Sequence, residues 1–166
     1  MTQCPGGVQR HLFGGDGIDT VDGGLGRNSG LGGEGDDLLI LGAGDTATGG
    51  EGADRFQYAA GLDTSAPAEI TDFNADTDTV EIVFDDGDGA DAPKVTVAES
   101  TTGETTYTDI LADGIVTIRL VGADALEAGD VVVTPASAAS DIDGETSNED
   151  VSTDSGDATA PTALAV

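Results

Sequence analysis

Basic, aromatic and sulfur-containing side chains are all scarce in this sequence. Its 166 residues include five Lys and Arg, six aromatic residues without tryptophan, one Cys and one His. A single cysteine excludes an intrachain disulfide and a thiolate metal cluster. The 33 acidic residues give a formal net charge of -28, so neither nucleic acid nor an anionic membrane surface is an expected partner. No run approaches the length of a membrane span, and residues 1–13 lack the basic and apolar regions of a cleaved signal peptide.

Glycine is abundant and follows a nine-residue period between residues 14 and 58. The units GGDGIDTVD, GGLGRNSGL and GGEGDDLLI are followed by LGAGDTAT, which is one residue short, and then by GGEGADRFQ. Glycines at the first, second and fourth positions permit positive φ angles, which predicts a six-residue turn followed by a three-residue strand. Such short strands must stack on copies of themselves. Residues 1–13 form a leader in which Gly6, Gly7 and Leu12 fall in phase, as in a degenerate repeat.

Two positions of the repeat have a fixed character. The sixth position always carries a side-chain oxygen, on Asp19, Asn28, Asp37, Asp45 and Asp54. The eighth position is expected to point inward, and it holds Val21, Leu39, Ala47 and Phe56, with Gly30 as the exception. Stacked turns would align the sixth-position oxygens in columns beside bent backbone carbonyls. Flexible ligation by oxygen alone favours Ca²⁺ over metals that prefer Cys or His.

Adaptation to high salt, or simple solubility, would also give an acidic composition. Neither accounts for the recurrence of acidic residues at one phase of the repeat. We therefore expect cation binding to contribute to the composition, and a salt-loving host would add to it.

The pattern G-G-x-G-x-D-x-U-x resembles the calcium-binding nonapeptide of the RTX (hemolysin-type) family, over residues 14–58. The following EITDFNADTDTVEI resembles the segment after such arrays in serralysin-type C-terminal domains. The resemblance implies an all-β fold: a parallel β-roll whose turns clamp Ca²⁺ at both edges. It also implies secretion to the extracellular space through a type I exporter that reads the C-terminus.

Successive turns of a β-roll alternate between two edges. The first, third and fifth units then place Asp19, Asp37 and Asp54 in one column, where we expect two calcium ions. The second edge, with Asn28 and the shortened turn at Asp45, is expected to bind one ion weakly or none. The candidate calcium-site residues are Gly14, Asp16, Asp19, Asn28, Gly32, Gly33, Gly35, Asp37, Asp45, Gly49, Gly50, Gly52 and Asp54. The acidic residues outside the sixth position are expected to face solvent (Asp16, Asp22, Glu34, Asp36 and Glu51).

Residues 59–134 are expected to form a β-rich segment that caps the roll. Alternating apolar residues predict strands at TVEIVF, KVTV, TYTDIL, IVTIRLVG and DVVVT, and a short helix is expected at ADALEAG. DDGDGAD lacks the twelfth-position Glu of an EF-hand, so it is interpreted as a hairpin turn. Asp72 and Asp78 either cap turns, which we favour, or support a further calcium site. Residues 135–166 form an acidic tail that is expected to be disordered, and its ending ALAV resembles a type I export signal.

These features predict a secreted, non-catalytic protein that folds on binding Ca²⁺ outside the cell. The sequence contains no H-E-x-x-H motif for a zinc protease. The chain could also be the C-terminal module of a larger secreted enzyme or adhesin, resembling those of proteases or alginate epimerases. An enzyme that uses paired carboxylates, as glycosidases do, and a structural module with incidental ions are further alternatives.

Overall fold

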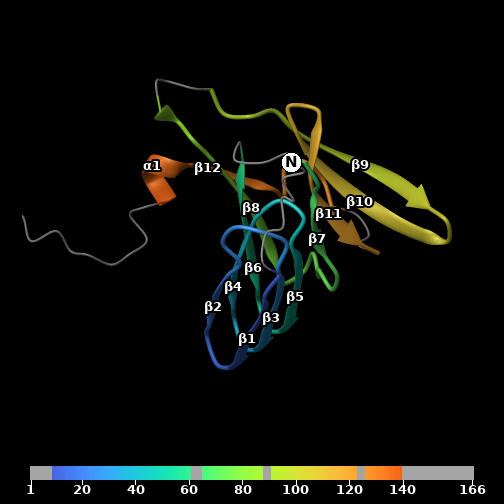
Figure 1. The fold of residues 1–166 in the computed structure, drawn as a ribbon. Helices are drawn as coiled ribbons and strands as arrows, with labels where there is room; N and C mark the ends of the chain where they lie inside the picture. The colour runs from blue at the N-terminus through green and yellow to red at the C-terminus, as the bar shows by residue number, and fades with distance from the viewer. Residues whose placement is uncertain (1–8, 61–64, 88–90, 123–125, 140–166) are drawn as a thin grey trace, which may run out of the picture.

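The computed structural model describes residues 9–60, 65–87, 91–122 and 126–139. Nearly all regular structure in these ranges is β, arranged as one seven-stranded and one five-stranded sheet (Figure 1). The first six strands belong to the glycine repeats. They are β1 (His11–Asp16), β2 (Thr20–Asp22), β3 (Ser29–Glu34), β4 (Leu38–Leu41), β5 (Thr46–Glu51) and β6 (Arg55–Ala60).

The repeat strands alternate between the two sheets, as expected for a parallel β-roll. Strands β1, β3 and β5 pair in parallel in one sheet, and β2, β4 and β6 do so in the other. The register aligns Val21, Leu39 and Phe56 across the second sheet. The missing residue of the short unit leaves Thr46 opposite Ser29, so the phase of the repeat is kept. The predicted fold class is therefore confirmed.

The core consists of the eighth-position side chains, which meet between the two sheets. Leu39, Ala47 and Phe56 are fully buried and Val21 is nearly so. Leu12 pairs with Gly30 and packs against this core. Leu12 of the leader therefore lies in phase with the eighth position of the repeats, whereas Gly6 and Gly7 lie outside the described residues.

The chain after the repeats extends both sheets. Strand β7 (Ala68–Ile70) pairs in parallel with β5, and β8 (Thr79–Phe84) pairs in parallel with β6. An antiparallel group of β9 (Val95–Thr102), β10 (Thr105–Ala112) and β11 (Ile115–Val121) joins β7 through β11. Strand β12 (Val132–Pro135) joins β8. The last repeat coil, formed by β5 and β6, is therefore covered by β7 and β8, which continue the hydrogen bonding of the two sheets.

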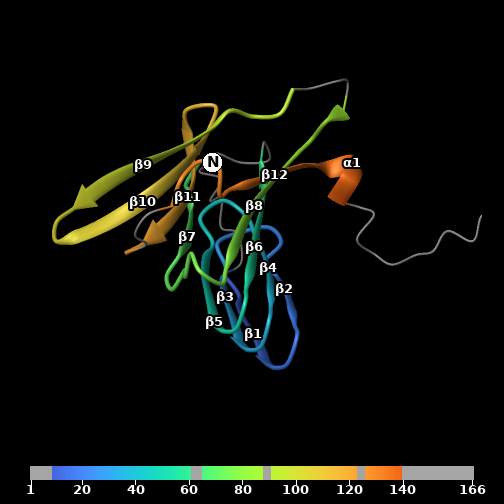
Figure 2. The same ribbon diagram turned by 180° about the vertical axis from the view of Figure 1, so that it is seen from behind.

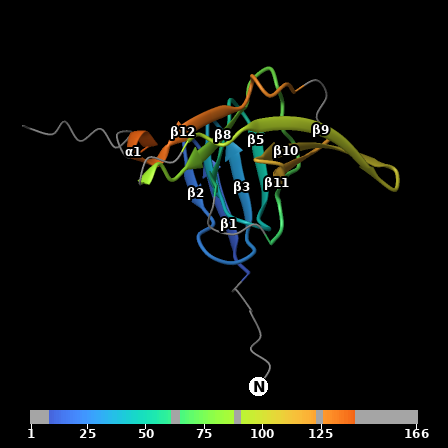
Figure 3. The same ribbon diagram turned by 90° about the horizontal axis from the view of Figure 1, so that it is seen from above.

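The antiparallel arm and the end of the described chain lie on opposite sides of the roll. Figures 1 and 2 show β9 and β10 reaching away from the repeat strands, with helix α1 (Ala136–Ala139) on the other side. The view from above shows the same separation (Figure 3). No helix in the ranges that the structure describes is long and apolar enough to cross a membrane.

Three expectations for the later segments were wrong. In ADALEAG, the described residues 126–129 contain no helix, and residues 128–130 form a turn. DDGDGAD does not close a hairpin, because β8 and β9 belong to different sheets. Residues 135–139 of the tail are ordered as the end of β12 and helix α1, and Asp86 accepts hydrogen bonds from the backbone and hydroxyl of Ser137 (3.2 and 2.5 Å). The rest of the tail, including ALAV, lies outside the described residues.

Candidate metal site

Three sixth-position aspartates form a column along one edge of the roll. Each lies in the turn just before a strand of the five-stranded sheet. The Oδ1 atom of Asp37 accepts a hydrogen bond from the backbone N–H of Asp19 (2.8 Å), and Oδ1 of Asp54 accepts one from Asp37 (3.0 Å). The structure therefore brings together the column that the register predicted.

The second carboxylate oxygen of the inner column members has no hydrogen-bond partner. Asp37 and Asp54 are each 2% exposed, and their Oδ2 atoms find no donor among the described residues. A buried carboxylate oxygen without a hydrogen-bond partner is costly, because burial removes it from bulk water. Burial raises the pKa of Asp54, and repulsion from Asp78 and Asp37 adds to this effect, although the hydrogen bond from Asp37 opposes it. Both oxygens would be stabilised by a cation.

Backbone carbonyls approach the same points as these carboxylates. A methyl group added at Gly32 would overlap Oδ2 of Asp37 and would lie 2.5 Å from the carbonyl oxygen of Gly49. One added at Gly14 would lie 2.6 Å from the Gly32 carbonyl and 3.0 Å from Oδ2 of Asp19. Glycine at the first position therefore leaves room where a carboxylate oxygen and a carbonyl oxygen converge, a donor set that suits a hard cation such as Ca²⁺.

The other candidate glycines allow the coils to stack closely. Gly33 has a φ of 132°, and a methyl group there would overlap the carbonyl of Gly15 in the neighbouring coil. The same combination of positive φ and close carbonyl approach is found at Gly35, Gly50 and Gly52. These residues position the turns, and any larger side chain would separate them.

The second edge has a different polar arrangement. Asp45 is also 2% exposed, but both of its carboxylate oxygens are hydrogen-bonded. Oδ1 accepts bonds from the backbone and side-chain nitrogens of Asn28 (2.6 and 3.2 Å), and Oδ2 accepts one from Gly42 (2.8 Å). The one buried oxygen without a partner at this edge is the neutral Oδ1 of Asn28, within the described residues. This edge is largely satisfied by protein donors.

Asp16 and the other array acids outside the sixth position are all exposed, as expected. Asp36 uses its Oδ1 to accept a hydrogen bond from the N–H of Ala53 (2.8 Å) in the next coil. Asp22 accepts one from Gly24 (2.9 Å). These side chains cap backbone groups at the surface of the roll. The described residues hold no cluster of three or more His, Cys, Asp or Glu side chains arranged for a metal, so backbone carbonyls are needed to complete any ligand shell.

Asp78, which the sequence placed outside the repeats, continues the column of the first edge. Its Oδ1 accepts a hydrogen bond from the backbone of Asp54 (3.1 Å), and its Oδ2 accepts one from Asn74 (2.9 Å). Asp72 accepts hydrogen bonds from Gly49 and Gly50, both 2.9 Å. The expected capping is confirmed for both residues. The signal for Asp78 in the sequence is an Asp just before the strand TVEIVF, the place that Asp occupies in each repeat of the first edge.

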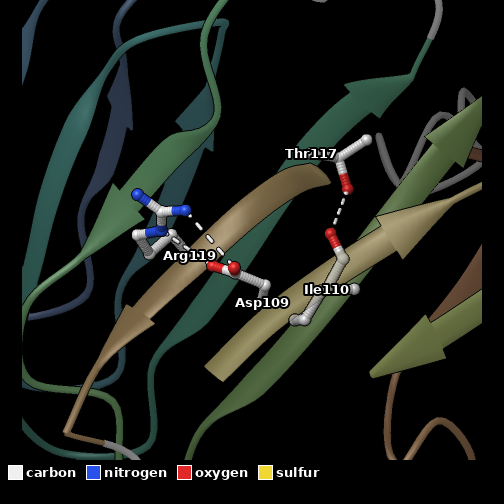
Figure 4. A network of polar contacts seen from close by, with 4 residues as sticks. All are labelled: Asp109, Ile110, Thr117 and Arg119. Atoms are coloured by element: carbon white, nitrogen blue, oxygen red, sulfur yellow. Dashed lines mark hydrogen bonds and ion pairs between the residues drawn. The ribbon is translucent and has the colours of Figure 1, made fainter. Parts of the chain in front are cut away.

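Two ion pairs outside the turns were not predicted from the sequence. Arg119 Nε donates to Asp109 (2.7 Å; Figure 4). The guanidinium of Arg119 also lies over the ring of Tyr107. Arg55 lies 2.6 Å from Glu81, which is fully buried. Burial acts to raise the pKa of each acid, but the hydrogen bonds that each receives, including those from its arginine, outweigh burial and lower it. Both acids are therefore paired side chains that stabilise the sheets.

Comparison with known proteins agrees with this architecture. No family model and no curated protein matches the chain. Among solved structures, the chain is similar to the AlgE6R3 subunit of the mannuronan C5-epimerase from Azotobacter vinelandii, with 28% identity and a TM-score of 0.53. The match covers 79% of this chain and 82% of that one. This likeness is compatible with the RTX-type repeat that the glycine and aspartate pattern indicates.

Proposed function

We propose that this protein is a calcium-binding repeat module whose roll is stabilised by Ca²⁺ at its first edge. The observation that carries the proposal is the pair of buried, unpartnered Oδ2 atoms on Asp37 and Asp54. Next to the first of them lies the carbonyl of Gly49, which faces the same point. Oxygen atoms in this arrangement match the ligand preference of Ca²⁺.

The same residues explain how binding would be coupled to folding. Without a cation, the column holds carboxylates at short spacing and leaves buried oxygens unpaired. With calcium, charge and hydration are compensated, and each site adds about 1.4 kcal/mol at ten times its Kd. We place two sites along Asp19, Asp37 and Asp54. The second edge binds one ion weakly or none, since Asp45 is already hydrogen-bonded at both oxygens.

We further propose that the protein acts outside the cell and has no catalytic activity of its own. A metal requirement at the high calcium concentrations found outside cells suits a chain that is exported unfolded, through a type I exporter, and folds afterwards. The likeness to a subunit of an epimerase supports the alternative that the chain serves as the folding module of a larger secreted enzyme. In both cases, we assign the aspartates of the first edge to cation binding in the turns and not to catalysis.

Calcium titration of the full chain tests the proposal. Isothermal calorimetry should show at least two bound Ca²⁺ ions, and circular dichroism should show β structure increasing over the same titration. Mg²⁺ serves as the control, because it demands stricter octahedral geometry and dehydrates reluctantly. A chain that has its full β spectrum in excess chelator and does not respond to calcium would contradict the proposal.

A further inference from the structure

The column of the first edge does not stop where the repeats stop. The hydrogen bond from the backbone of Asp54 to Oδ1 of Asp78 repeats the geometry of the two bonds within the array. Asp78 belongs to the loop between β7 and β8, which has no glycine repeat. This loop also places Asp72 on the backbone of Gly49, at the last complete turn.

At this junction, the Oδ2 atom of Asp54 is buried without a hydrogen-bond partner among the described residues. Within the array, Oδ2 of Asp19 and of Asp37 each approach the same point as the carbonyl of the glycine that opens the next turn at this edge. Asp54 belongs to the last turn of the array, and among the described residues the loop of residues 71–78 takes the place of the next turn at this edge. Its Oδ2 is buried beside Gly49 and has no donor in the described part of the chain.

The carboxylates of the loop lie close enough to act on Asp54. Asp78 accepts a hydrogen bond from the backbone of Asp54 itself (3.1 Å), and Asp72 accepts one from Gly49 (2.9 Å), the residue beside which Oδ2 of Asp54 is buried. The oxygens of Asp72 and Asp78 already accept backbone hydrogen bonds, but each carboxylate oxygen has a second lone pair for a cation. Capping therefore orients these two side chains without using up their capacity as ligands.

We propose that Asp54, Asp72 and Asp78 form a third divalent-cation site, at the junction between the repeat array and the segment that caps it. The ligand is a hard cation of the Ca²⁺ class, and backbone oxygens complete its shell, because the three side chains alone do not form a ready cluster. The site rests on the proposed function, but it uses residues outside the nonapeptides. Its consequence is that calcium binding joins the capping segment to the roll, so both fold in one transition.

The test compares the full chain with Asp72→Asn and with the control Asp36→Asn. Asp72 is exposed, so the substitution leaves the core intact. The control removes one negative charge at the same edge from a side chain that also caps the neighbouring coil. Calorimetry should show one fewer Ca²⁺ per chain for Asp72→Asn and an unchanged stoichiometry for Asp36→Asn.

A second measurement locates the ion without relying on stoichiometry. A small fraction of Mn²⁺ added to the calcium-loaded, ¹⁵N-labelled protein should broaden the amide signals of Asp72 and Asp78, which lie outside the array sites. In Asp72→Asn this broadening should be lost, while the signals around Asp37 stay broadened. If the variant binds as many ions as the unaltered chain and keeps the broadening, the junction site is refuted and the array sites stand. If the unaltered chain binds no calcium, the proposed function itself fails.

Discussion

Replacing Asp37 by Asn separates the two roles that its carboxylate plays. Oδ1 accepts a hydrogen bond from Asp19, which an amide oxygen can also accept. Oδ2 is buried without a partner and faces the carbonyl of Gly49. An amide nitrogen at that place could donate to the carbonyl, so the substitution removes a buried charge and adds a hydrogen bond.

The expected effect on the free energy of unfolding differs between chelator and calcium. In chelator, Asp37→Asn should be neutral or should raise the free energy of unfolding by up to about 1–3 kcal/mol, the usual cost of an unsatisfied buried group. In calcium at ten times the Kd, loss of the site should remove about 1.4 kcal/mol of the stabilisation by the ion. The gain in stability on adding calcium should therefore shrink.

The matched control is Asp45→Asn at the second edge. Asp45 is equally buried, but an amide there would turn a donor towards Asn28 or Gly42, which already donate. We expect a loss of about 1–3 kcal/mol with and without calcium. Urea unfolding followed by circular dichroism, in chelator and in calcium, measures all four values. If Asp37→Asn loses as much stability in chelator as Asp45→Asn does, Oδ2 of Asp37 is not an unpaired oxygen available to a cation, and the reasoning is wrong.

Three further predictions concern pH, the antiparallel arm and coil stacking. The pKa of Asp54 in the folded protein is raised above its ordinary value of 3.8, so its contribution to the free energy of unfolding is favourable at low pH and is lost as pH rises through the raised value. Urea unfolding of the metal-free protein should show this pH dependence, and Asp54→Asn should reduce it. Arg119→Met should cost about 3 kcal/mol with or without calcium, because it leaves the buried carboxylate of Asp109 unpaired; equal melting temperatures for variant and parent would contradict this. Gly33→Ala should lower the melting temperature far more than Gly15→Ala: φ is positive at both, 132° and 122°, but a methyl group meets a carbonyl only at Gly33 and has open space at Gly15, and similar losses would show that stacking is looser than described.

Much of the roll follows from the sequence because its repeat leaves little choice. The short strands of one repeat cannot bury a core alone, so the period forces stacking, and stacking fixes which residues align. Val21, Leu39 and Phe56 could be placed in the core from their phase alone. The same phase placed Asp37 between Asp19 and Asp54, since consecutive turns must alternate between edges.

The capping segment was less predictable because its strands carry no period. The alternation in TVEIVF indicates a strand, but nothing local indicates that β8 pairs with β6, or that β9 lies in the other sheet. Those choices depend on which edge of the roll remains open when the chain leaves it. The short helix expected at ADALEAG failed for a related reason: seven residues are too few to form a stable helix without tertiary packing, even when most of them favour helix.

The sequence by itself determined the repeat, the parallel β-roll and the column of acidic side chains, because each depends on spacing along the chain. Only the tertiary structure decided which sixth-position carboxylate oxygens are left without a donor among the described residues: Oδ2 of Asp37 and Asp54, but neither oxygen of Asp45. It also decided that Asp78 extends the column beyond the repeats. Whether a carboxylate oxygen finds a donor depends on the positions of backbone N–H groups in the neighbouring coil, and these positions are fixed only in the folded chain.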